Sequence, residues 1–87
     1  MIYFQKKYIF FGGSSMNFYQ RLRDVREDAD KSQAEIAKVL NIQQTQYSRY
    51  ERGVQTMGID KYVALSEYYN ISLDYLCGLI DRPRKLR

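Results

Sequence analysis

From Phe18 onward, apolar residues recur at three- and four-residue steps, the spacing that places side chains on one face of an α-helix. A first stripe predicts an amphipathic helix that ends near Asp28, and its members are Phe18, Leu22, Val25 and Ala29. A second stripe consists of Ile36, Ala37 and Leu40. The pattern therefore predicts two successive helices, each with one buried face.

Residues typical of helix ends mark the boundaries of these segments. Ser32 and Glu35 have the spacing of a capping box, in which each side chain bonds the other residue's backbone amide at a helix start. Asn41 tolerates the left-handed conformation that ends many helices, and Gly53 adopts it readily. We therefore predict a helix from Ser32 to Asn41 and another from about residue 44 to residue 52.

Two further helices are expected nearer the C-terminus. One starts at or near Gly58, ends at Asn70 and carries Ile59, Tyr62, Val63, Leu65 and Tyr69. Ser72 caps a short fifth helix that contains Leu73 and Leu76 and extends toward Leu79. Five short helices with brief connections predict a compact all-α domain over residues 16–80, followed by a basic tail at 81–87.

The first fifteen residues, MIYFQKKYIFFGGSS, differ from the rest of the chain. They are aromatic and β-prone, end in a Gly-Gly-Ser-Ser breaker, are too short to span a bilayer and lack the order of a signal peptide. Three interpretations stay open: an edge strand that pairs two subunits, a disordered arm, or a non-native leader. The third arises because Gly12-Gly13 can be encoded by a purine-rich ribosome-binding sequence just before Met16, which would then be the true start.

Composition narrows the classes of function. The 87 residues suit one domain and contain no histidine and one cysteine, Cys77. We therefore expect no enzyme, no metal site and no cofactor, and a reducing, cytoplasmic location. The net charge of +4 arises at the two ends of the chain, since residues 18–80 hold eight basic and nine acidic side chains. Bulk charge alone thus gives weak support to a polyanionic partner.

The segment from Ser32 to Gly53 has a more specific pattern. Ala37 is small where a following helix must cross closely, Asn41 supplies a sharp turn, and Tyr47 can fill the gap between the two helices. This spacing is typical of a helix-turn-helix, although an ordinary helical hairpin has the same length.

Three segments in this order carry a wider resemblance: MNFYQRLRDVRED, SQAEIAKVLNIQQTQYSRYERG and NISLDYLCGL. Together they resemble the lambda-repressor-like, xenobiotic-response-element type of helix-turn-helix regulators over about residues 17–79. Asp30-Lys31 stands where that family usually has a glycine and an apolar residue, so we expect a looser first turn. The resemblance implies that the helix at 44–52 lies in the major groove of DNA.

The resemblance also implies which side chains face the bases: Gln44, Thr45 and Arg49. Helical geometry agrees, because positions 44, 45, 48, 49 and 52 share one face while Tyr47, Tyr50 and Glu51 share the other. Glutamine can bond adenine and arginine can bond guanine through two atoms each, and Ser48 completes the set of base-contact candidates. The alternative for this face is an ordinary solvated helix surface.

Other residues are candidates for the DNA backbone and for structure. Gln33, at the first turn of the second helix, is implied to contact a phosphate. Further phosphate candidates are Gln43, Arg52, Gln55 and Lys61. In the family pattern Arg26 and Glu51 form an ion pair that fastens the first helix to the third, so we assign Glu51 to structure.

We therefore expect a non-enzymatic, sequence-specific double-stranded DNA-binding regulator, a repressor from a bacterium or phage. Such domains act as homodimers on near-palindromic operators. A dimer would use the fifth helix with the segment LIDRPRKLR, or the aromatic leader, unless DNA itself assembles it. No membrane or small-molecule effector is expected. The tail is expected to be a frayed, solvated end or to lie along the DNA backbone. The rival function is a protein-interaction module, such as an antitoxin or anti-repressor component, which would use the acidic end of the first helix.

Overall fold

The computed structural model describes residues 18–87, and the three interpretations of residues 1–15 lie outside this part of the chain. Its helices are α2 (Gln20–Asp28), α3 (Gln33–Leu40), α4 (Gln44–Arg52), α5 (Ile59–Tyr69) and α6 (Leu73–Leu76). Within residues 18–87 there is no strand, only an isolated antiparallel bridge between Ile71 and Lys85. The predicted all-α domain is confirmed. None of the described helices combines the length and apolar character needed to cross a membrane.

The predicted helix ends are also confirmed. Ser32 and Glu35 form the capping box, with the Ser32 hydroxyl accepting from the Glu35 amide and the Glu35 carboxylate accepting from the Ser32 amide. Asn41, Gly53 and Asn70 end their helices in the left-handed conformation, with φ of 59°, 76° and 57°. These ends allow the chain to reverse direction within one or two residues.

The expected looseness of the turn after α2 is wrong. Asp30 adopts the left-handed conformation that glycine would supply, with φ of 60°. Its amide donates to Glu27 O at 2.9 Å, and the Lys31 amide donates to Arg26 O at 3.1 Å. The Arg26 side chain adds a bond from Nη1 to Lys31 O at 2.9 Å, so the turn is held from both sides.

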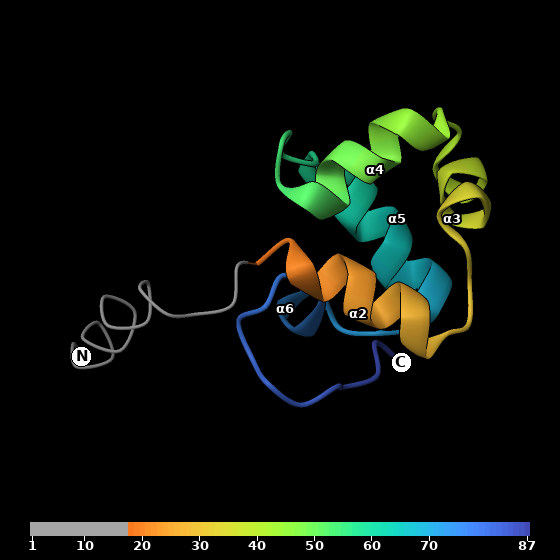
Figure 1. The fold of residues 1–87 in the computed structure, drawn as a ribbon. Helices are drawn as coiled ribbons and strands as arrows, with labels where there is room; N and C mark the ends of the chain where they lie inside the picture. Colours follow the sequence, from red (N-terminus) through yellow and green to blue (C-terminus); the bar gives the residue numbers. More distant parts are fainter. Residues whose placement is uncertain (1–17) are drawn as a thin grey trace.

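The helices enclose one core, with α5 running through the middle of the domain (Figure 1). Tyrosines fill much of it, because Tyr47, Tyr50 and Tyr62 are buried and Tyr69 is half-buried. The remaining buried apolar residues are Leu22, Val25, Ile36, Ala37, Met57, Leu65, Tyr75 and Leu76.

Five apolar residues that the pattern assigned to helical stripes are exposed instead, including Ala29 at the end of α2. Phe18 precedes the first turn of α2 and is 47% exposed, while Leu79 lies beyond the end of α6 and is 65% exposed. Ile59 and Val63 lie one turn apart on α5 and are 65% and 42% exposed, so this side of α5 faces solvent. The spacing of apolar residues alone therefore does not determine where a helix ends or which of its sides is buried.

A buried arginine joins α2 and α6. The Arg21 guanidinium donates through Nη1 to Tyr75 O at 2.8 Å and to Ile80 O at 3.0 Å, and it lies 4.0 Å from the centre of the Tyr75 ring. These contacts satisfy one carbonyl group in α6 and one in the segment after it, and they allow the charge to be buried.

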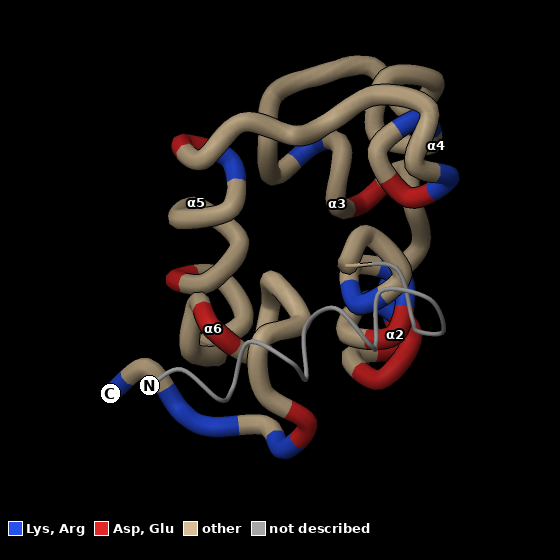
Figure 2. Tube along the Cα trace, turned by 90° about the vertical axis from the view of Figure 1, so that its left-hand side faces the viewer, with Lys and Arg blue, Asp and Glu red and all other residues tan. Residues whose placement is uncertain are grey.

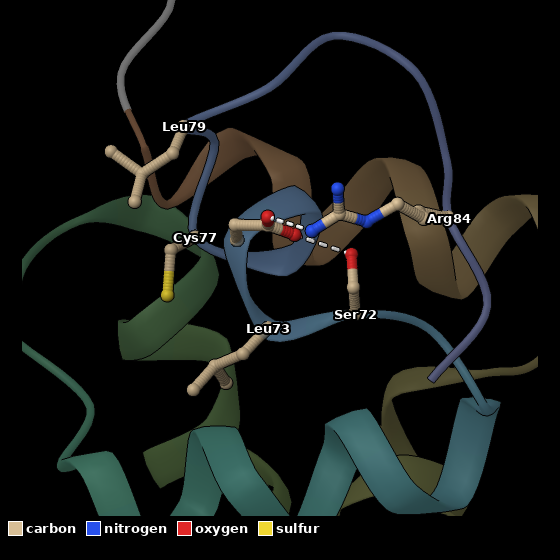
Figure 3. Close-up of a pocket in the computed structure, with 6 residues that line it drawn as sticks. Ser72, Leu73, Cys77, Leu79 and Arg84 are labelled. Atoms are coloured by element: carbon tan, nitrogen blue, oxygen red, sulfur yellow. Dashed lines mark hydrogen bonds and ion pairs between the residues drawn. The ribbon is translucent and has the colours of Figure 1, made fainter. Parts of the chain in front are cut away.

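The basic tail is paired rather than frayed. Ser72 N donates to Arg84 O at 2.6 Å, and Leu86 N donates to Asn70 O at 3.3 Å. In Figure 3 the Arg84 guanidinium and the Ser72 hydroxyl both reach the carboxylate of Asp74, beside a shallow pocket lined by Leu73, Cys77 and Leu79. The tail therefore lies along the turn between α5 and α6.

Candidate nucleic-acid interface

The α4 helix forms one edge of the domain and presents a polar face to solvent. In Figure 1 it lies at the top, whereas α6 and the tail lie at the bottom, and Figure 2 shows the same separation after a quarter turn. Gln44, Thr45 and Arg49 are exposed on this helix. The tail does not cover them.

The opposite face of α4 attaches the helix to the core. Tyr47 and Tyr50 are 0% and 4% exposed and meet edge to face with their ring centres 6.4 Å apart. Gln46, at the margin, donates from Nε2 to the Tyr50 hydroxyl at 2.8 Å. Because one face is packed in this way, the other face is held in a fixed orientation.

The four base-contact candidates differ in their surroundings. The side chains of Gln44, Thr45 and Arg49 make no hydrogen bond or ion pair within residues 18–87, which leaves their donors and acceptors available. Ser48 is half-buried, and its hydroxyl accepts a long hydrogen bond of 3.3 Å from Arg52 Nε. Its own proton is still available for a partner outside the chain.

The phosphate candidates surround α4. Gln43 is the N-cap residue and is exposed, but its side chain makes no capping hydrogen bond. Gln55 is exposed in the loop after Gly53, and the guanidinium of the exposed Arg52 lies one turn from Ser48. Lys61, near the start of α5, is half-buried and lies 3.8 Å from the Asp60 carboxylate. Each is able to donate to an anion.

Arg26 and Glu51 form the ion pair that the resemblance implied. Arg26 Nε lies 2.7 Å from Glu51 Oε2, and Arg26 Nη2 donates to Glu51 Oε1 at 3.0 Å. The side chains are only 12% and 3% exposed, so the pair is shielded from water between α2 and α4. Such a paired arrangement supports the packing role assigned to Glu51.

Gln33 makes a contact that the sequence did not suggest. Its Nε2 donates to Glu51 Oε1 at 3.0 Å, so the first residue of α3 reaches the same carboxylate as Arg26. Spacing along one sequence gives no signal for this bond, because the two residues are eighteen positions apart on different helices.

The electrostatics of this cluster keep Glu51 ionised. Burial alone raises the pKa of Glu51, but hydrogen bonds from Arg26 and then Gln33 outweigh burial and hold the pKa below its usual range. The Tyr47 hydroxyl is buried next to this carboxylate, and its pKa is raised, first by burial and then by the negative charge. The cluster is thus a fixed anion with cationic and polar neighbours.

Acidic residues are concentrated away from the exposed face of α4. Asp24, Glu27, Asp28 and Asp30 are exposed along the second half of α2 and the turn after it. In Figure 2 the red segments of α2 lie below α4, and the last turn of α4 contains the basic residues Arg49 and Arg52. An anion approaching the exposed edge of α4 would therefore meet cations first.

Comparison with known proteins identifies the same segment. The helix-turn-helix family profile matches residues 22–76. The HTH-type transcriptional regulator ImmR of Bacillus subtilis (strain 168) is 40% identical over 70 residues, which are 80% of this chain and 55% of ImmR. The uncharacterized HTH-type transcriptional regulator YobD of the same strain is 33% identical over 66 residues, covering 76% of this chain and 59% of YobD.

A third relative comes from a phage. The cryptic phage CTXphi transcriptional repressor RstR of Vibrio cholerae serotype O1 (strain ATCC 39315 / El Tor Inaba N16961) is 33% identical over 63 residues, covering 72% of this chain and 56% of RstR. The chain thus spans between 55% and 59% of the length of these three relatives.

Proposed function

The chain belongs to the lambda-repressor-like helix-turn-helix family, and we propose that it is a transcriptional repressor that binds double-stranded DNA through α4. The observation that carries this proposal is the two-sided character of α4. Tyr47, Tyr50 and Glu51 fix one face in the core, while the other face offers Gln44, Thr45 and Arg49 without partners within residues 18–87.

Those three side chains have the chemistry of base recognition. An exposed glutamine amide can pair with adenine, and an exposed guanidinium can donate twice to guanine. Thr45 can contact the thymine methyl group, and Ser48 can donate its hydroxyl proton to a base edge. In this arrangement the exposed face of α4 enters the major groove, whose width accepts one helix.

Contacts with the phosphates would hold α4 in register. Gln43 and Arg52 lie at the two ends of α4, Gln55 lies in the next loop, and Lys61 lies in the first turn of α5. Gln33 adds a donor at the start of α3. Contacts of this kind orient a protein on the duplex without reading its sequence.

The remaining parts of the proposal follow from this role. Two copies would bind a near-palindromic operator with half-sites about one helical turn apart. The protein would act by binding DNA in the cytoplasm, with no chemical reaction, cofactor or small-molecule effector. The similarity to ImmR, a transcriptional regulator, and to RstR, a transcriptional repressor, supports a role in regulation, and the similarity to RstR supports repression.

The proposal is tested by selecting binding sites from random duplex DNA with the purified chain and with Gln44→Ala and Arg49→Ala. Each substitution is expected to relax preference at one position of each half-site, by about 1–3 kcal/mol of discrimination. Lys38→Ala, which removes an exposed charge from α3, is the matched control and should keep the consensus. An unchanged consensus with both α4 variants would refute the assignment of those residues. Absence of any selected sequence, together with stable co-purification of a protein partner, would favour the interaction-module function.

A further inference from the structure

We propose that Glu51 is a positioning residue for DNA binding, because its carboxylate fixes the direction in which the Gln33 amide presents a hydrogen-bond donor to a phosphate. This inference rests on the proposed function. It assigns to Glu51 a second role beyond the ion pair with Arg26.

The geometry of the Glu51 carboxylate allows both roles at once. Oε2 accepts from Arg26 Nε at 2.7 Å, and Oε1 accepts from Arg26 Nη2 and from Gln33 Nε2, each at 3.0 Å. Arg26 is itself held by its bond to Lys31 O at 2.9 Å. The acceptor for Gln33 is therefore fixed by contacts with α2 and by the packing of α4.

The contact with Glu51 fixes the orientation of the Gln33 side-chain amide. An amide has a carbonyl group on one side and two N–H groups on the other, and an exposed amide rotates freely between them. An ionised carboxylate only accepts hydrogen bonds, so Gln33 must turn its NH₂ group toward Glu51. One N–H group is then used, and the second has no partner within residues 18–87.

The position of Gln33 makes this second donor useful. Gln33 is the first residue of α3, where the backbone amides of the first turn also favour an anion. The Glu35 amide is already used by Ser32, and the Glu35 carboxylate lies at the same helix end. Side-chain donation from Gln33 thus adds to a helix end whose own donors are partly occupied.

The proposed role of Glu51 and simple electrostatics predict opposite effects on DNA binding when the Glu51 charge is removed. Removing a negative charge near a phosphate should strengthen DNA binding if charge alone acts. If Glu51 orients Gln33, Glu51→Gln should instead weaken binding, because a neutral amide can accept from or donate to Gln33 and no longer selects one orientation. The expected loss is about tenfold in Kd, the equivalent of one hydrogen bond to a charged group.

The experiment measures Kd for the selected duplex with the full chain, at a temperature where circular dichroism shows every variant folded. The variants are Glu51→Gln, Gln33→Ala and the double variant. We expect Glu51→Gln to lose about tenfold in the wild-type background and less than about twofold when Gln33 is already alanine. Equal losses in both backgrounds, or no loss in the wild-type background, would overturn the proposal.

Glu35→Gln is the matched control. It neutralises another carboxylate at the start of α3 that has no contact with Gln33. We expect unchanged or tighter binding from this variant, as charge alone requires. If the proposed function is wrong, the result is different, because the unmodified chain and Glu35→Gln would then also show no preference for any duplex.

Discussion

The ring of Tyr19 covers the Cα atom of Gly53, so closely that a Cβ atom at position 53 would overlap the ring carbons. The residue before α2 thereby packs against the residue that ends α4. Gly53 is needed for a second reason as well, since its φ of 76° is unfavourable for residues with a side chain.

We expect Gly53→Ala to lower the free energy of unfolding by about 1–2 kcal/mol through the left-handed backbone alone, with the overlap adding to that loss. Urea denaturation followed by circular dichroism measures this change. In Gly53→Ala combined with Tyr19→Ala, the overlap is removed and only the backbone penalty is added to the loss of the ring. Gly58→Ala is the matched control, because φ there is −70° and the nearest atom is the Asp60 carboxylate at the end of an exposed side chain. Equal losses for positions 53 and 58 would contradict this account.

Glu51→Ala is expected to lower the melting temperature strongly. It leaves the Arg26 guanidinium shielded from water without its partner, which destabilises proteins by about 3–5 kcal/mol. Thermal unfolding measures the change. The control is Glu27→Ala, which breaks an exposed pair with Arg23 at 3.1 Å and should change stability by about 0.5 kcal/mol or less. An unchanged melting temperature for Glu51→Ala would remove its structural role.

Lowering the pH should reduce the free energy of unfolding of the domain. The folded-state pKa of Glu51 lies below its unfolded value of about 4.3, so its stabilising effect is fully present above that pH. The effect is lost as the pH falls through the lower, folded-state pKa. Hydrogen bonds lower the pKa of Glu35 and of Asp74 as well, chiefly from Ser32 and Ser72 respectively.

Denaturation titrations between pH 7 and pH 2 are expected to show this loss, and Glu51→Gln should make the curve flatter below about pH 4.3. The chain has no histidine, so we expect little change in stability between pH 5 and pH 8. A steep change in that neutral range would point to a group outside this account.

Asp74 is expected to hold the tail in place. Asp74→Asn removes the ion pair with Arg84 and leaves the backbone bonds between residues 70–72 and 84–86 and the bond from Arg87 N to Asn70 Oδ1. Amide exchange at Leu86 and trypsin cleavage after Arg84 and Lys85 should both become faster. Asp81→Asn, in the tail itself, is the control and should leave both rates unchanged. Equal cleavage rates in the two variants would show that the backbone bonds alone are sufficient.

Arg52 should contribute to affinity without contributing to sequence preference. If Arg52 contacts one phosphate, Arg52→Ala reduces the slope of log Kd against log salt by about 0.9 and weakens binding to all duplexes alike. Arg49→Ala, one turn earlier on the same exposed face, should instead change which duplex is preferred. Fluorescence anisotropy at several salt concentrations separates the two effects.

The helix ends were predictable because they depend on local chemistry. Ser32 with Glu35, Asn41, Gly53 and Asn70 each act through a side chain or backbone within a few residues, and a single sequence displays them all. The buried and exposed faces of α4 were predictable for the same reason, since the helical repeat fixes which residues share a face.

The tertiary contacts were not predictable from these local rules. Arg21 looks like a surface cation in the sequence, yet its carbonyl acceptors come from residues 54 and 59 positions later. Pairing of the tail with Asn70 and Ser72 depends on where α5 ends in space, and the bond from Gln33 to Glu51 depends on how α3 crosses α4. The exposure of apolar residues on α5 likewise depends on how the helices pack against one another.

The pairing of the tail has a practical consequence for handling the molecule. Arg87 N donates to Asn70 Oδ1 at 3.1 Å, so Arg87 is anchored at the end of the domain remote from α4. A fluorophore attached at position 87 would therefore lie on that side of the domain. Such a label should leave the exposed face of α4 uncovered.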